Sequence, residues 1–136
     1  MKRSSYKLTV RGYELDSFGH VNNAVYLQYA EAAMWNFFKV HGLLTATLNE
    51  GLFPVIMESS QRYIRELKML DEVRIDTEVS CSGGIVSYKH NIINKNTGLV
   101  SCRVTGKIAY VNKDRMICDV PEVVRTCLEG EDNDDQ

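Results

Sequence analysis

The fold of this chain is decided by one stretch near its start, Tyr13-Glu14-Leu15-Asp16-Ser17-Phe18-Gly19-His20-Val21-Asn22-Asn23-Ala24-Val25-Tyr26. Residues 6–13 alternate apolar and polar side chains, which is typical of a half-buried strand. Asn22 or Asn23 is suited to begin a helix, because its side-chain oxygen can accept a backbone N–H of the first turn. The stretch therefore predicts a strand, then a loop that carries Asp16 and Gly19, then a helix.

The helix is expected to run from about Asn23 to Val40 and to end near Gly42, a residue suited to the left-handed conformation that follows a helix. Its side chains are mostly apolar, and the polar ones form a narrow arc made by Gln28, Glu31, Asn36 and Lys39. A helix with so little polar surface is buried on several sides. In a chain of 136 residues, this predicts a sheet wrapped around one long central helix.

The rest of the chain predicts mainly strands, over residues 54–67, 72–81, 85–93 and 100–110, with turns at 82–84 and 94–98. Residues 119–128 are expected to form a short helix, with Pro121 in its first turn. This order predicts an α+β fold in which an antiparallel sheet packs on one helix, in a single domain over residues 1–128. The acidic residues 129–136 are expected to be a disordered tail.

Composition excludes several classes of function. The last eight residues hold five acids and no base, so the body carries 16 bases against 13 acids. That balance suits an anionic small molecule or an acidic carrier, and it is too weak to predict nucleic-acid binding. No apolar run approaches the ~20 residues of a membrane span. The four cysteines and three histidines lack metal-ligand spacing, so no metal or cofactor is expected. Because no signal-like segment is present, the chain is expected to be cytoplasmic.

Residues 16–27, with Tyr29 and Glu31 beyond them, resemble the 4-hydroxybenzoyl-CoA thioesterase-like branch of the hotdog-fold superfamily. Residues 10–26 are most similar to the plant acyl-lipid thioesterases, which act on acyl-acyl carrier proteins, and to their bacterial relatives. The resemblance covers roughly residues 5–112. It implies a hotdog domain that assembles as a homodimer or homotetramer, with active sites at the subunit interface. It also implies a role in fatty acid metabolism: hydrolysis of a fatty or related acyl thioester of coenzyme A or acyl carrier protein.

The catalytic acid of this family falls at Asp16, and two mechanisms are open for it. Asp16 could attack the thioester carbonyl as a nucleophile, or it could activate a water as a general base. The thiol that leaves has a pKa near ~8.5, so no strong acid is needed to expel it. The alternative to catalysis is an Asp that only braces the loop before the helix.

Residues around Asp16 supply the other expected parts of the site. The backbone N–H groups of Asn22, Asn23 and Ala24 are candidate donors to the developing oxyanion, because the first turn of a helix leaves N–H groups without acceptors. The Asn side chains are expected to position rather than react. His20 is expected to orient or brace the loop, with a role as base or substrate donor as the alternative.

Four further polar residues could contact the substrate or a partner subunit: Glu31 on the helix, and Glu58, Ser59 and Ser60 in an otherwise apolar strand. A solvated surface position explains each of them about as well. Two other functions compete with hydrolysis. One is a protein that binds acyl thioesters without catalysis. The other is a hotdog hydratase or dehydratase, which needs a His paired with an Asp or Glu near the β-carbon.

Overall fold

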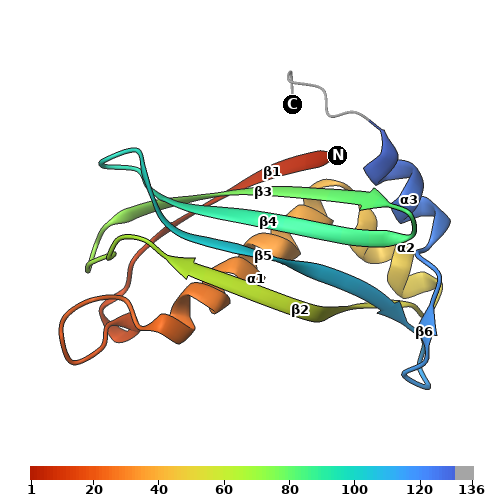
Figure 1. Cartoon of the computed structure of the whole chain (residues 1–136), viewed down its shortest axis with the longest axis horizontal. Coiled ribbons are helices and arrows are strands. Elements are labelled where there is room, and N and C mark those ends of the chain that lie inside the picture. The colour runs from red at the N-terminus through yellow and green to blue at the C-terminus, as the bar shows by residue number, and fades with distance from the viewer. Residues whose placement is uncertain (131–136) are drawn as a thin grey trace.

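Within residues 1–130, which this computed structural model describes, six strands form one antiparallel sheet (Figure 1). Five of them lie in the order β1-β3-β4-β5-β2, and a short sixth strand pairs with β5. Their bounds are β1 Lys2–Thr9, β2 Phe53–Tyr63, β3 Glu72–Ser82, β4 Ile85–Asn94, β5 Leu99–Val111 and β6 Ile117–Cys118. Most of the predicted acidic tail lies outside the described residues.

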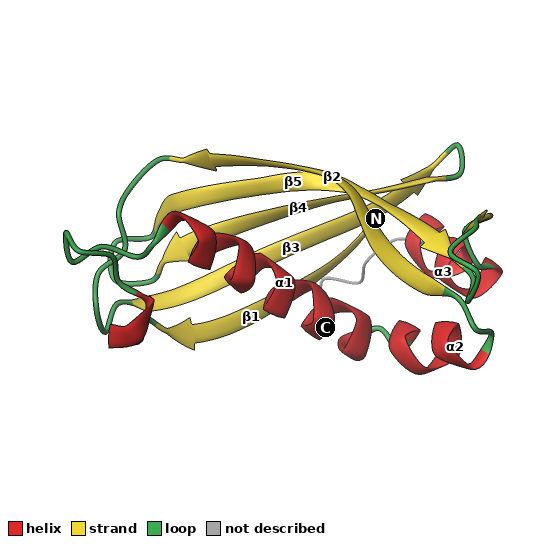
Figure 2. Ribbon diagram, turned by 90° about the horizontal axis from the view of Figure 1, so that it is seen from below, coloured by secondary structure: helices red, strands yellow, loops and turns green. Residues whose placement is uncertain are grey.

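The helix α1 (Asn23–Val40) lies across one face of this sheet, and α2 (Leu43–Asn49) follows it closely (Figure 2). The bounds of α1 agree with the predicted range, from about Asn23 to Val40. Asn22 caps its start, because the Asn22 side-chain oxygen accepts the N–H of Ala24 at 2.9 Å. At its end, Gly42 has a φ of +69°, the left-handed conformation for which glycine is suited.

The prediction of one helix wrapped by the sheet is corrected in two respects. First, α2 is an additional helix, which was not predicted because seven residues are too few to show a helical period. The short helix predicted over residues 119–128 is found as α3 (Glu122–Glu129). Second, the sheet covers only one side of α1. Leu27, Trp35 and Val40 remain between 41% and 60% exposed on this helix.

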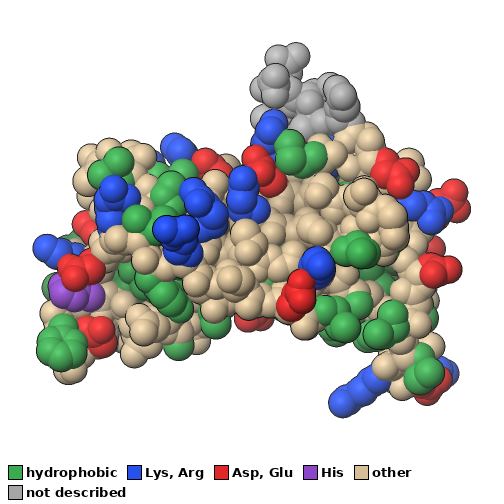
Figure 3. Space-filling view, in the orientation of Figure 1, with side chains coloured by type: hydrophobic (Ala, Val, Ile, Leu, Met, Phe, Trp, Pro, Cys, Tyr) green, Lys and Arg blue, Asp and Glu red, His purple; other side chains and the backbone are tan. Residues whose placement is uncertain are grey.

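The core lies between α1 and the inner face of the sheet, because alternate residues of β3, β4 and β5 point toward the helix. These residues meet buried side chains of α1: Tyr26, Tyr29, Ala30, Ala33, Met34, Phe37 and Phe38. The opposite face of the sheet carries charged side chains, and Lys and Arg gather over one half of it (Figure 3).

Some predicted strand boundaries were wrong. The first strand is Lys2–Thr9 rather than residues 6–13, and Gly12–Glu14 forms a turn of 3₁₀ helix, η1. The chain turns there because the Glu14 carboxylate accepts the backbone N–H of Arg11 at 2.8 Å, which favours a tight turn over continued sheet. Strand β2 ends at Tyr63, and β6 follows the strand that was predicted to be last.

Candidate active site

Asp16 lies in the loop between η1 and α1, and its carboxylate organises that loop. Its Oδ1 accepts the backbone N–H of Phe18 at 2.9 Å and that of His20 at 3.2 Å. The Asp16 N–H donates to the carbonyl of His20 at 2.7 Å, and the N–H of Gly19 donates to the carbonyl of Asp16 at 3.1 Å. Gly19 adopts a φ of +81°, which lets the loop close this tightly.

The second carboxylate oxygen of Asp16 is not used by this loop. Among residues 1–130, no hydrogen-bond donor or cation is found for Oδ2, and the side chain is partly exposed. The bracing role and the chemical role are therefore compatible, because each can use a different oxygen. A carboxylate with a fixed orientation and one unoccupied oxygen can act as a base or as a nucleophile.

The start of α1 leaves one backbone donor unoccupied. The N–H of Asn22 donates to the carbonyl of Glu14 at 3.0 Å, and the N–H of Ala24 is taken by the Asn22 side chain. No acceptor for the N–H of Asn23 is found in the described part of the chain. Of the three predicted oxyanion donors, Asn23 is thus the one whose N–H remains available at the positive end of the helix dipole.

His20 makes a polar side-chain contact that the sequence did not indicate. Its Nε2 lies 3.0 Å from Oε2 of Glu66, a residue in the segment that follows β2. The two segments are joined next to this contact, because the N–H of Val21 donates to the carbonyl of Leu67 at 2.9 Å. His20 is therefore held by a tertiary contact, which fits the predicted orienting role.

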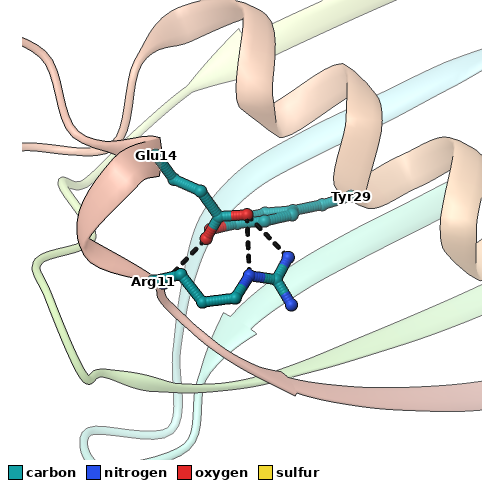
Figure 4. Close-up of polar contacts among 3 residues, drawn as sticks. All are labelled: Arg11, Glu14 and Tyr29. Carbon is teal, nitrogen blue, oxygen red and sulfur yellow. Dashed lines mark hydrogen bonds and ion pairs between the residues drawn. The ribbon is translucent and has the colours of Figure 1, made fainter.

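Behind the Asp16 loop lies a buried network of Arg11, Glu14 and Tyr29 (Figure 4). The Glu14 side chain is 6% exposed. Its carboxylate accepts hydrogen bonds from Nε and Nη2 of Arg11 at 3.1 and 2.6 Å, and from the Tyr29 hydroxyl at 2.7 Å. Glu14 lies two residues before Asp16 in the chain. The network therefore connects the Asp16 loop to Tyr29 of α1.

The network keeps Glu14 ionised. Burial by itself would raise the pKa of Glu14, but the hydrogen bonds from the Arg11 guanidinium and N–H outweigh it, and the pKa is lowered. The pKa of the Tyr29 hydroxyl is raised by burial and by its bond to the Glu14 carboxylate, so Tyr29 stays a donor. A charge held in this way makes the loop rigid.

A cavity of about 430 Å³ lies between α1 and the sheet, bordered by β2. Its walls are mainly apolar, and Glu31 and Ser59 are among the predicted residues that line it. Two polar side chains of β4, Tyr88 and His90, also line it. Neither Asp16 nor His20 borders this cavity within the one chain described.

His90 is 1% exposed, and its Nδ1 lies 2.7 Å from the hydroxyl oxygen of Thr77 on β3. Burial lowers the pKa of His90 to about 4, so the imidazole is neutral near pH 7. The sequence shows His90 only as one position of an alternating strand. Its contact with Thr77 follows from the register of β3 and β4, which places the two residues opposite each other.

The other predicted polar residues are dispersed. Glu58 and Ser60 border a second, shallower hollow with Ser59 and Gly106. Glu58 pairs with Lys107 across the sheet at 3.3 Å, as a solvated surface residue does. The Oε1 of Glu31 accepts a hydrogen bond from Nε1 of Trp35 at 3.4 Å.

Two kinds of feature are absent from residues 1–130. No three His, Cys, Asp or Glu side chains in this part of the chain are grouped as metal ligands would be. None of the helices in the same residues is both long enough and apolar enough to cross a membrane.

Comparisons with known proteins identify the family of this chain. A family model described as the thioesterase-like superfamily matches residues 10–128. The chain is 30% identical over 90 residues to the acyl-acyl carrier protein thioesterase ATL3, chloroplastic, of Arabidopsis thaliana, a match that covers 65% of this chain and 47% of that protein. The chain thus spans about half the length of this curated relative.

Solved structures share the fold at low sequence identity. A 1,4-dihydroxy-2-naphthoyl-CoA thioesterase from Synechocystis, Slr0204, has a TM-score of 0.82 at 15% identity and covers 93% of this chain and 95% of its own. The probable thioesterase YbaW of Escherichia coli has a TM-score of 0.82 at 23% identity, with 92% and 96% covered. At such identities, the likeness shows a common fold.

Proposed function

Because this chain belongs to the thioesterase-like superfamily, we propose that it hydrolyses an acyl thioester of coenzyme A or acyl carrier protein to a free acid and a thiol. The observation that carries the proposal is the state of Asp16. One carboxylate oxygen is fixed by two backbone N–H groups, and the other has no partner among the described residues. The relatives named as thioesterases support the same reaction.

The reaction needs a group that attacks the thioester carbon. Asp16 either removes a proton from a water as it attacks, or attacks directly and forms an anhydride that water then cleaves. In both routes the carbon–sulfur bond breaks, and the thiolate leaves without a strong acid. The free Oδ2 serves either route, so the geometry is compatible with both.

The developing negative charge on the carbonyl oxygen needs a donor. We assign the backbone N–H of Asn23 to this role, because the N–H groups of Asn22 and Ala24 have acceptors within the protein. The first turn of α1 adds the positive end of the helix dipole. Asn22 acts as the cap that holds this turn, and His20 orients the loop through Glu66.

A second copy of the chain is part of the proposal. The cavity and the Asp16 loop are separate within one chain, and strand β2 lies at an edge of the main sheet. Apolar side chains of β2 and α1 are exposed beside that edge, including Ile56, Met57 and Trp35. An exposed apolar sheet edge is a ready surface for association. We therefore propose a homodimer or homotetramer that associates through β2 and α1. In this assembly, a thioester bound at the Asp16 loop of one copy places its acyl group in the cavity of another copy.

The test is the release of free thiol from acyl-CoA and acyl-carrier-protein thioesters by the wild type and by Asp16→Asn. The Asn side chain keeps an oxygen that can accept the N–H groups of Phe18 and His20, so the loop is preserved while the carboxylate is lost. We expect kcat to fall by about 100-fold or more. Asp114→Asn, at an exposed turn, is the matched control and should leave kcat unchanged. Full activity in Asp16→Asn would show the mechanism to be wrong.

One observation favours a second function. The His20–Glu66 pair is of the kind that a hydratase uses to move a proton at the β-carbon. A 2-enoyl thioester separates the two functions, because hydration removes its ultraviolet absorbance without releasing thiol. If absorbance is lost without thiol release, and His20→Gln abolishes that loss, the chain is a hydratase.

A further inference from the structure

We propose that the cavity beneath α1 binds the acyl group of the substrate, and that His90 and Tyr88 make it selective for acyl groups that carry a hydroxyl or oxo oxygen. This inference rests on the proposed thioesterase function, and it names the substrate class of that site. It is carried by His90, a buried side chain with a ring nitrogen for which no partner is found among residues 1–130, and by Tyr88 beside it, in a cavity whose walls are mainly apolar.

The cavity has the size and walls of a ligand site. Its volume of about 430 Å³ lies within the range of small-molecule pockets. Apolar side chains of α1 and β5 form most of its wall: Leu27, Ala30, Met34, Phe38, Val104 and Ile108. An acyl chain fits such walls, because burying its methylene groups removes them from water.

His90 places one polar atom in this wall. Its Nδ1 is taken up by the Thr77 hydroxyl, and no partner for Nε2 is found among residues 1–130. Because the ring is neutral, one nitrogen carries a proton and the other a lone pair. The Thr77 hydroxyl can donate or accept, so Nε2 of His90 can accept from a ligand hydroxyl or donate to a ligand carbonyl.

Tyr88 lies beside His90 and borders both this cavity and the second hollow. The two rings lie 5.1 Å apart, two residues along the same face of β4. The hydroxyl of Tyr88 lies against Gly106 of β5, where a Cβ atom would collide with it. Gly106 thus makes room for the phenol to lie across the sheet. No hydrogen-bond partner of this hydroxyl is found in the described part of the chain, although Tyr88 is only 6% exposed.

These two groups discriminate between acyl chains. A plain alkyl chain would fill the cavity but would cover Nε2 of His90 and the Tyr88 hydroxyl without pairing them, which is unfavourable. A chain with a hydroxyl or oxo group at the right carbon would pair with at least one of them. A site built to bind a substrate oxygen rejects the analogue that lacks it.

The experiment compares octanoyl-CoA with octanoyl-CoA derivatives that carry one hydroxyl or oxo group at each of carbons 3 to 7. We expect the wild type to show a kcat/KM at least tenfold higher for one or more oxygenated chains than for octanoyl-CoA. Tyr88→Phe removes one hydroxyl and keeps the ring, and His90→Phe removes the imidazole. At least one of these variants should lower the ratio of kcat/KM between the oxygenated and the plain chain about tenfold.

Tyr110→Phe is the matched control, because Tyr110 is a buried tyrosine of β5 that does not border the cavity. It should leave the preference unchanged. Thermal unfolding of each variant checks that it folds. If His90→Phe does not fold, the comparison of Tyr88→Phe with the wild type still tests the inference. Equal rates across the panel, or a preference that survives in both cavity variants, would overturn the inference while the proposed function stands.

Two further outcomes are distinguishable. If the wild type hydrolyses no thioester, the proposed function fails. The selectivity of the cavity is then tested by calorimetric binding of the same thioesters, and equal affinities for plain and oxygenated chains refute it. Ala30→Leu fills the cavity and should shift the activity toward shorter chains at unchanged oligomer mass. A change of oligomer mass with an unchanged chain-length profile would show that a second copy occupies the cavity instead, and would overturn the inference.

Discussion

Glu14 keeps a negative charge almost out of contact with water, two residues before the proposed catalytic Asp16. Three groups donate to it: the Arg11 guanidinium, the Arg11 N–H and the Tyr29 hydroxyl. Because Arg11 itself is about half exposed, the ion pair is partly screened by solvent. The hydrogen bonds to the charged carboxylate are therefore the larger part of what Glu14 contributes to stability.

Glu14→Gln tests this network at the level of one side chain. The amide keeps the shape but loses the charge, so we expect the free energy of unfolding to fall by about 1–3 kcal/mol at pH 7. The pKa of Glu14 is lowered on folding from its ordinary value of 4.5. The contribution of the carboxylate is thus complete above pH 4.5 and is lost as the pH falls through the folded-state pKa. Urea unfolding at several pH values measures both effects.

The matched control is Glu50→Gln, at an exposed position after α2, which should change little at any pH. A difference between wild type and Glu14→Gln that stays constant from pH 7 down to pH 3 would contradict the ionised network. The same substitution should also lower the catalytic rate. If the network positions the Asp16 loop, Glu14→Gln lowers kcat by a larger factor than it raises KM.

At the level of paired strands, β2 and β5 place two arginines directly opposite each other, Arg62 and Arg103. Nε of Arg103 donates to the side-chain oxygen of Asn91 at 2.9 Å. Among residues 1–130, no carboxylate pairs with Arg62 or Arg103. Like charges that face each other across a sheet destabilise it. Arg103 alternates with the buried Cys102 and Val104 along β5, so the pair lies on the face of the sheet turned away from α1. Lys and Arg side chains gather on part of that face (Figure 3).

Arg62→Gln is therefore expected to stabilise the protein, by about 0.5 kcal/mol at low ionic strength. The gain should shrink at high salt, because exposed charges are then screened. Lys89→Gln is the control on the neighbouring strand. Lys89 lies 3.4 Å from Glu78, so its removal should give no gain. Unfolding in urea at two salt concentrations measures both variants, and a loss of stability in Arg62→Gln would refute the prediction.

At the scale of the whole molecule, the described chain leaves an apolar surface open along β2 and α1. Ile56 and Met57 are 54% and 56% exposed, and Trp35 and Leu27 on α1 are 48% and 41% exposed. α1 lies across the inner face of the sheet, and α3 packs against β3 (Figure 2). A surface of this kind favours association with a second copy, which would bury it.

Ile56→Glu tests the proposed assembly. A buried, unpaired carboxylate in an interface is costly, so we expect the variant to sediment as a single chain where the wild type sediments as a dimer or tetramer. Its thioesterase activity should fall with the assembly. Val123→Glu on α3 is the control, because Val123 is 40% exposed and α3 packs against β3 and α2. A wild type that sediments as one chain would refute the assembly.

Local signals in the sequence determined much of this protein. The Asn cap and the left-handed Gly42 set the ends of α1, and alternating side chains set β3, β4 and β5. The motif around Asp16 indicated hotdog-fold thioesterases, and the family match and the solved structures confirm that resemblance. The catalytic role of Asp16 stays a prediction. The sequence did not indicate η1 and α2, because both elements are too short for a periodic pattern.

The tertiary structure alone decided which distant residues meet. Glu66 reaches His20, Thr77 lies opposite His90, and Tyr88 lies over Gly106. None of these pairs has a signature in composition or spacing, because strand register and the packing of α1 on the sheet create them. The sequence by itself therefore determined most of the elements, and the prediction that Asp16 reacts rests on it. The fold determined the cavity, its polar groups and the exposed surface beside it, because these depend on contacts between segments far apart in the chain.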